Sequence, residues 1–338
     1  MSASRAPTRV GARRARRHSA SRAWLAVAAA TLAACGAPPP DPVPPNSFAF
    51  GVFGDGPYNP GELGPWRRVL ADVRHSDVAW LIHVGDLFSH PCSNAMFAER
   101  RTELESVGHP VIYTPGDNEW TDCWKKRPGR YDPLERLAAL RSVFFANPGR
   151  SLGPNPLVLE SQSSDAGFAE FRENARWMRG GFVFATIHVV GSSNGLEPFA
   201  ARTAANDAEV ERRTAAALSW LDEAFAHAAD RKATGVVLAM HGDMALESRS
   251  RSRPGYDRFL DRLEHHVASF PGTVLLIHGD SHIQRIDQPL KDAAGRVYPR
   301  FIRLETFGSP EIGWVRVVVD TVAGRIIRYE PRRVPGGW

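Results

Sequence analysis

Five short motifs in this sequence place an acid or a histidine directly after a run of apolar residues. The motifs are Gly54-Asp55-Gly56-Pro57, Gly85-Asp86, Gly116-Asp117-Asn118-Glu119, Met240-His241-Gly242-Asp243 and Gly279-Asp280-Ser281-His282. One Gly-Asp pair would mean little, because both residues are common in turns. Four such pairs, each after a strand-like run, indicate a shared site, since ligands of open α/β sheets bind beyond the carboxyl ends of the strands.

The chemistry of such a site follows from its charges. Several carboxylates gathered at one edge of a sheet repel one another unless cations bind them. Mixed Asp and His donors suit Zn, Fe, Mn or similar ions. The motifs therefore predict a metal site.

The elements that position these motifs alternate between β-like and helical patterns, which predicts one α/β domain over residues 47–338. We expect a layered β-sandwich flanked by helices, with antiparallel strands near the C-terminus. The predicted strands cover residues 48–53, 78–84, 111–114, 182–190, 236–240, 274–278, 301–306, 314–320 and 325–329. The predicted helices cover residues 66–73, 131–145, 204–229 and 254–270.

The order and spacing of the motifs resemble the calcineurin-like metallophosphoesterase superfamily over about residues 48–320. Members carry Asp-x-His, Gly-Asp, Gly-Asn-His-Asp/Glu, a lone His and Gly-His-x-His, and they hold two metals that share the Gly-Asp carboxylate. The resemblance implies this fold and makes Asp55 the first ligand, Asp86 the bridging carboxylate, His241 the lone His and His282 the last His.

The sequence also departs from that pattern. Pro57 stands at the first His, Asp117 at the Asn, Asn118 at the catalytic His and Asp280 at the first His of the last motif. Asp117 and Asp280 can still ligate a cation, whereas the side chain of Pro57 cannot. We prefer this register because an acid and an aromatic residue follow Asn118, as they often follow that His in relatives. A gapped register would make Asn118 the ligand.

The resemblance thus implies two divalent metals, or one, held by a common set of side chains. The predicted ligands are Asp55, Asp86, Asp117, His241, Asp280 and His282. His278 lies two residues before Asp280, on the same face of an extended strand, and is an alternative ligand.

The loss of the catalytic His raises the question of which group protonates the leaving group. Asn118 can orient phosphate but carries no proton to donate. His188 is the candidate general acid, and it precedes a Gly-Ser-Ser-Asn-Gly loop whose hydroxyl and amide groups could hold phosphate oxygens. The alternative for His188 is a hydrogen-bonded histidine at a strand end.

The resulting hypothesis is a metal-dependent hydrolase that acts on a phosphoester, with a water activated by the bound cations attacking phosphorus. The alternative is a protein of the same fold that binds a metal or a phosphorylated envelope component without turnover. The presence of Asn118 at the position of the catalytic histidine favours this alternative.

The first 35 residues are predicted to be a signal peptide. An Arg-rich start precedes an apolar run at 23–34, and Leu32-Ala33-Ala34-Cys35 resembles the lipobox of bacterial lipoproteins. This predicts an extracytoplasmic protein anchored to the membrane by a lipid on Cys35, with residues 36–46 as a Pro-rich tether. The alternative is an ordinary cleaved signal with an incidental cysteine.

Charge and cysteine content support this organisation. The chain carries 42 Lys and Arg against 37 Asp and Glu, a net charge of +5, but seven arginines precede Cys35. The remainder has a net charge of −2, which argues against a nucleic-acid partner. Cys92 and Cys123 are predicted to pair in an oxidising compartment, with two buried free thiols as the alternative.

Overall fold

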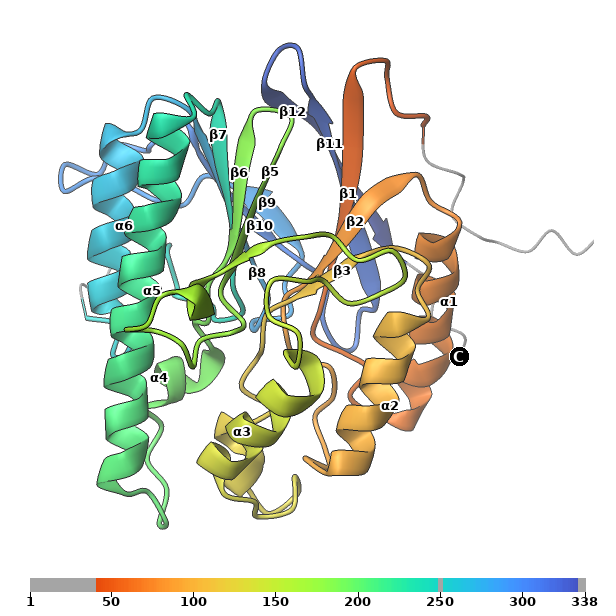
Figure 1. Cartoon of the computed structure of the whole chain (residues 1–338), viewed down its shortest axis with the longest axis vertical. Helices are drawn as coiled ribbons and strands as arrows, with labels where there is room; N and C mark the ends of the chain where they lie inside the picture. The colour runs from red at the N-terminus through yellow and green to blue at the C-terminus, as the bar shows by residue number, and fades with distance from the viewer. Residues whose placement is uncertain (1–40, 249–251, 334–338) are drawn as a thin grey trace, which may run out of the picture. The chain divides into compact units, whose positions relative to one another are not determined.

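Two β-sheets form the centre of the structure, a computed structural model that describes residues 41–248 and 252–333 (Figure 1). The predicted signal peptide with Cys35, and residues 36–40 of the tether, lie outside these residues. Within the described ranges, no helix combines the length and the apolar character that crossing a membrane requires.

The first sheet has five strands, three of them parallel. Its order is β12 (Arg325–Arg333), β11 (Gly313–Asp320), β1 (Ser47–Phe53), β2 (Val78–His83) and β3 (Val111–Tyr113). Strands β1, β2 and β3 run parallel, while β11 and β12 are antiparallel to their neighbours. The carboxyl ends of β1, β2 and β3 therefore meet at one edge.

The second sheet has seven strands with a parallel centre. Its order is β4 (Glu160–Ser161), β5 (Ala175–Arg179), β6 (Phe182–Thr186), β7 (Gly235–Ala239), β8 (Thr273–His278), β10 (Phe301–Glu305) and β9 (Arg285–Asp287). Strands β6, β7, β8 and β10 are parallel, and β4, β5 and β9 are antiparallel to their neighbours.

The two sheets pack face to face through alternate residues of their strands. In β1, Phe50 faces the second sheet, where its ring meets Phe184 edge-on with centroids 5.4 Å apart. Trp80 of β2 stacks on Phe50 and also meets Phe184. Because side chains alternate across a strand, the other face of each sheet is left to pack against helices.

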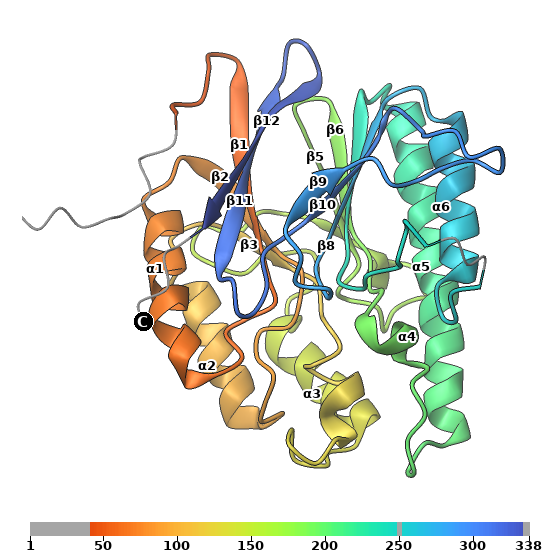
Figure 2. The same cartoon turned by 180° about the vertical axis from the view of Figure 1, so that it is seen from behind.

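Helices cover the outer faces of both sheets. Helices α1 (Leu63–Arg74), α2 (Asn94–Glu105) and α3 (Pro133–Phe144) share a core with the first sheet. Helices α5 (Ala204–Asp230) and α6 (Asp257–Ser269) lie side by side on the second sheet (Figures 1 and 2). The predicted helix-flanked sandwich is confirmed.

The differences from the sequence prediction are local. Strand β6 ends at Thr186 rather than at residue 190. Helix α2 and strands β4, β5 and β9 were not predicted. In α2 the buried side chains include Arg100 together with Phe97 and Leu104, so its apolar stripe is narrow and gives a weak helical pattern.

A disulfide joins Cys92 and Cys123, as predicted. Both cysteines are buried, and they lie in the segments that follow β2 and β3. Their sulfur atoms lie 3.3 and 3.5 Å from the carbonyl oxygen of Asn118. The bridge therefore ties two neighbouring strand-end segments together directly beside Asn118.

We expect removal of this bridge in Cys92→Ala/Cys123→Ala to lower the free energy of unfolding by about 2–4 kcal/mol, because the unfolded chain regains conformational freedom. Urea unfolding without reductant measures the change. Cys35→Ala, which leaves the pair intact, is the matched control. An unchanged unfolding midpoint in the double variant would contradict the prediction.

Candidate metal centre

The predicted metal ligands come from strand ends of both sheets. Asp55, Asp86 and Asp117 follow β1, β2 and β3, while His241 and Asp280 follow β7 and β8. All of these strands are in parallel regions of their sheets, so their carboxyl ends point to one place. The packing of the two sheets brings the two groups together.

His241 is at the centre of this cluster and is fully buried. Its Nε2 atom lies 2.9 Å from Oδ1 of Asp117 and 3.4 Å from Oδ1 of Asp86. Oδ1 of Asp280 is 3.8 Å from the same nitrogen. Asp55 approaches the other side of the ring, with Oδ1 3.9 Å from Nδ1.

Both candidate histidine ligands are oriented by the backbone. Nδ1 of His241 is hydrogen-bonded to the carbonyl of Val84 at 2.9 Å, and Nδ1 of His282 to the carbonyl of Ser309 at 2.7 Å. A carbonyl accepts only, so each Nδ1 carries a proton. In both rings Nε2 is left to face the carboxylates, with that of His282 3.9 Å from Oδ1 of Asp55. A histidine ligand is commonly oriented by such a bond.

The glycines of the motifs make room for carboxylates from neighbouring strands. A Cβ on Gly116 would lie 2.1 Å from Oδ1 of Asp86, and one on Gly279 would lie 2.0 Å from Oδ2 of Asp55. No side chain larger than hydrogen fits at such distances. The Gly-Asp repetition therefore has a steric cause in addition to the turn preference.

Burial and charge displace the pKa values of these groups when no cation is bound. Burial raises the pKa of Asp55 to about 8 and that of Asp280 to about 6. Burial alone would lower the pKa of His241, but Asp86 and the hydrogen bond to Asp117 raise it well above its usual value. For Asp117, burial alone would raise the pKa, but the hydrogen bonds to His241 and Ser192 hold this pKa below its usual value.

The donor set fits divalent cations. Oδ2 of Asp55 is buried and has no hydrogen-bond partner among the described residues, an expensive state for a carboxylate oxygen. Two overlapping groups place their donor atoms within 4.8 Å of one another: Asp55 with Asp86 and His241, and Asp117 with His241 and Asp280. Oxygen-rich donors with imidazole suit Mn, Fe or Zn.

Asn118 and Glu119 support this edge. The backbone N–H of Asn118 donates to Oδ1 of Asp86 at 3.0 Å, and its side-chain N–H donates to Oδ2 at 2.6 Å. The carboxylate of Glu119 accepts the N–H groups of Leu87 and Gly116, which joins the segments after β2 and β3. Asp117, not Asn118, directs an oxygen at His241.

His188 lies in a different environment. It is fully buried, with Nδ1 2.7 Å from Oε1 of Glu173 and its ring edge-on to Trp120. Arg141 pairs with the same Glu173 carboxylate. Among the described residues, no hydrogen bond or ion pair joins His188 to the six predicted ligands, and its proton-donor role stays a prediction.

The alternative ligand His278 is directed elsewhere. Its Nδ1 lies 2.9 Å from the carbonyl oxygen of Gly279, and its Nε2 lies 3.9 Å from Oε2 of Glu305. Both His278 and Glu305 are buried. The geometry therefore places this imidazole toward Glu305 rather than in the cluster around His241.

The predicted phosphate-binding loop is a short left-handed turn, α4 (Gly191–Gly195), in which Ser192, Ser193 and Asn194 all have φ between 51° and 54°. The Ser192 hydroxyl lies 2.8 Å from Oδ2 of Asp117 and 2.9 Å from Oδ1 of Asp122. Buried Arg213 donates to the side chain and backbone of Asn194. This support holds a backbone conformation that is costly for non-glycine residues.

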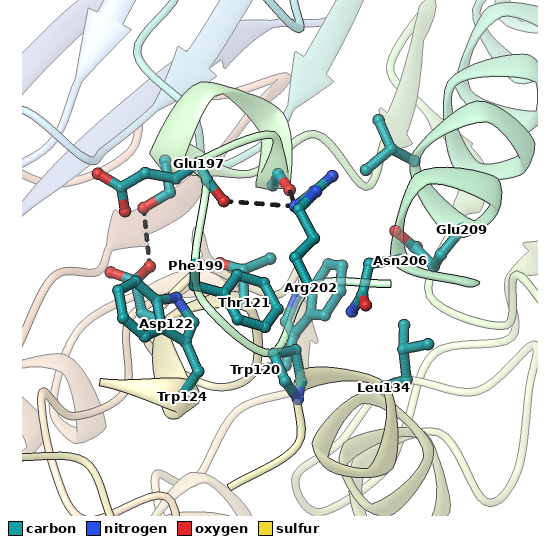
Figure 3. A pocket seen from close by; sticks show the side chains of 14 residues that line it. Trp120, Thr121, Asp122, Trp124, Leu134, Glu197, Phe199, Arg202, Asn206 and Glu209 are labelled. Carbon is teal, nitrogen blue, oxygen red and sulfur yellow. Dashed lines mark hydrogen bonds between the residues drawn. The ribbon is translucent and has the colours of Figure 1, made fainter. Parts of the chain in front are cut away.

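A pocket is lined by residues that include Asp122 and Ser192, and Ser192 is hydrogen-bonded to Asp117 of the cluster. Figure 3 shows Asp122, Trp124, Phe199 and Arg202 around this pocket. The rings of Trp124 and Phe199 stack with centroids 5.2 Å apart, and burial raises the pKa of Asp122 to about 6. Ser192 therefore connects the wall of this pocket to Asp117.

One residue at the cluster was missed by the sequence analysis. The phenolic oxygen of Tyr58 lies 2.5 Å from Oδ2 of Asp86, and its ring meets that of His282 edge-on. Tyr58 is only three residues after Asp55, in the same strand-end segment. Its proximity to that motif was the available signal, but the direction of the ring depends on tertiary contacts.

No family model matches the sequence, and the search of curated proteins returns no match. Among solved structures, a phosphatase from Mycoplasma pneumoniae has a TM-score of 0.44 at 12% identity, covering 86% of this chain and 94% of that one. The protein TT1561 of Thermus thermophilus has a TM-score of 0.44 at 11% identity, covering 85% and 99%. GAP50, the anchor in the inner membrane complex of Plasmodium, has a TM-score of 0.42 at 12% identity, covering 86% and 89%.

We expect the cation-free protein to lose stability between about pH 6.5 and 8. Folding raises the pKa of Asp55 from 3.8 to about 8 and raises that of His241, so the folded state holds protons that the unfolded state has released. The free energy of unfolding therefore falls as pH rises through this range, by up to about 1.4 kcal/mol per pH unit for each group. Burial lowers the pKa of His83 from 6.5 to about 3, so this group makes the free energy of unfolding rise with pH. That effect is confined to pH values below 6.5, the pKa of His83 in the unfolded chain.

Urea unfolding of metal-stripped protein across this range measures the slope. Asp55→Asn, which cannot titrate, should flatten it, and added Zn²⁺ should stabilise the wild type more at pH 8 than at pH 6.5. The same slope in wild type and Asp55→Asn would contradict the assignment.

Proposed function

We propose that this protein is a metal-dependent hydrolase of phosphoric esters, of the metallophosphoesterase type. The observation that carries the proposal is the buried imidazole of His241 with the carboxylates of Asp86, Asp117 and Asp280 within 3.8 Å of its Nε2 atom. Such a gathering of acids is stabilised by cations, and cations held between Asp and His are suited to phosphoryl chemistry.

The proposed ligands divide into two overlapping sets. Asp55, Asp86 and His282 would hold one cation, and Asp86, Asp117, His241 and Asp280 the other, with Asp86 between them. Bound there, divalent cations would lower the pKa of water and neutralise the charge of a phosphoryl group. Asn118, Ser192 and the neighbouring pocket would then position the substrate.

The second candidate is a protein that binds a metal or a phosphorylated envelope component without turnover. Asn118 favours this reading, since its N–H groups are directed at Asp86 and it has no proton to give a leaving group. Metal content and turnover distinguish the candidates, because a metal-loaded but inert protein supports only the second.

For location, we propose that the mature protein is extracytoplasmic and held at the membrane by a lipid on Cys35. The disulfide between Cys92 and Cys123 is consistent with an oxidising compartment. The lipobox-like junction is the sequence feature that supports the anchor.

We expect Asp86→Asn to lose both cations and to abolish hydrolysis of phosphomonoesters and phosphodiesters, because one carboxylate serves both sets. Asp55→Asn should weaken mainly one cation. Metal analysis of purified protein, followed by turnover with added Mn²⁺ or Zn²⁺, measures both effects. The exposed Asp230→Asn at the end of α5 is the matched control. Wild-type metal content and turnover in Asp86→Asn would refute the mechanism.

We further propose that His188 donates the leaving-group proton. His188→Gln should then lower turnover of alkyl phosphates by about 10²–10⁴-fold and affect activated aryl phosphates much less, since these need little protonation. Because His188 is buried against Glu173, thermal unfolding is measured in parallel. Equal losses for both substrate classes would exclude the role and indicate a structural one.

A further inference from the structure

Tyr58 lies at the end of the cluster that contains Asp55 and His282. Its phenolic oxygen is 2.5 Å from Oδ2 of Asp86, and its ring centroid is 5.2 Å from that of His282. Asp55 is the third group at this end, with Oδ1 3.9 Å from Nε2 of His282. Thus one phenol, two carboxylates and one imidazole meet here.

The backbone of Tyr58 is fixed on both sides. Its N–H donates to Oε2 of Glu62 at 2.7 Å, and its carbonyl accepts the hydroxyl of Ser89 at 2.9 Å. The ring is therefore carried by a segment that is bonded both to its own loop and to the segment after β2.

Tyr58 and His282 share one support. The carboxylate of Glu62, which holds the N–H of Tyr58, also accepts the hydroxyl of Ser309 at 2.6 Å. The carbonyl of Ser309 in turn orients His282 through its Nδ1 atom. The backbone N–H of Ser309 donates to the carbonyl of Asp55 at 2.9 Å. One network thus supports the backbone of Tyr58, the ring of His282 and the backbone of Asp55.

The proposed ligand set at this end has three protein donors besides Tyr58. Pro57, two residues after Asp55, has no side-chain donor, and Asp55, Asp86 and His282 supply three groups. A phenolate is a hard, anionic oxygen donor, like the two carboxylates beside it, and so suits the same oxygen-preferring cations.

We propose that Tyr58 is a metal ligand, completing a four-residue set with Asp55, Asp86 and His282. On binding, the phenolic O–H bond breaks, the oxygen coordinates the cation and the proton passes to solvent. This inference rests on the cation site of the proposed function but not on its catalytic activity.

The test is titration of metal-stripped protein with Zn²⁺, which is colourless, so that the near-ultraviolet difference spectrum reports tyrosinate alone. Wild type should gain the signal of one tyrosinate per chain at saturation. Tyr58→Phe, which keeps the ring against His282, should gain none and should bind this Zn²⁺ at least about 10-fold more weakly by calorimetry. Circular dichroism and thermal unfolding confirm that the variant is folded.

Tyr298→Phe is the matched control, because it also removes a phenol bonded to an acid, Glu264, but Tyr298 lies just before the start of β10, whereas the motifs follow the carboxyl ends of strands. It should retain the tyrosinate signal and the affinity. Zn²⁺ binding to wild type without tyrosinate, or an unchanged signal in Tyr58→Phe, would overturn the inference alone. Tyrosinate formation without any phosphoester turnover would instead overturn the proposed hydrolase. Failure of wild type to bind Zn²⁺ would overturn both.

Discussion

The constraint on which this structure depends is the collection of buried carboxylates around a single imidazole. Asp55, Asp86 and Asp117 are all largely removed from water, and His241 is the positive group between them when no cation is bound. Burying like charges together costs free energy that a single imidazolium only partly offsets. Divalent cations at this position would offset that cost.

That cluster exists because two sheets end at the same place. Neither sheet alone carries the full donor set: the first supplies Asp55, Asp86 and Asp117, and the second supplies His241 and Asp280. Aromatic packing between the sheets, through Phe50, Trp80 and Phe184, holds their mutual position. The hydrophobic layer thus sets the distances between the polar groups at the strand ends.

Supports around the cluster are made by separate short networks. Glu119 joins the segments after β2 and β3, while the Cys92–Cys123 bridge lies beside Asn118. Glu62 connects the segment of Tyr58 to Ser309. Such bonds restrict the movement of donor side chains, which favours metal binding whether the site turns over a substrate or only holds one. These supports therefore do not distinguish the two proposed functions, enzyme and binder.

The sequence by itself determined the sandwich, most of its strands and the carboxylates at the strand ends, because apolar alternation and Gly-Asp pairs are local signals. It did not reveal α2, whose buried face includes Arg100. Only the tertiary structure decided that His188 faces Glu173, that His278 faces Glu305 and that Tyr58 reaches Asp86. The physical reason is that a strand pattern specifies where a side chain starts, whereas its direction and partner depend on segments distant in the chain that packing brings beside it.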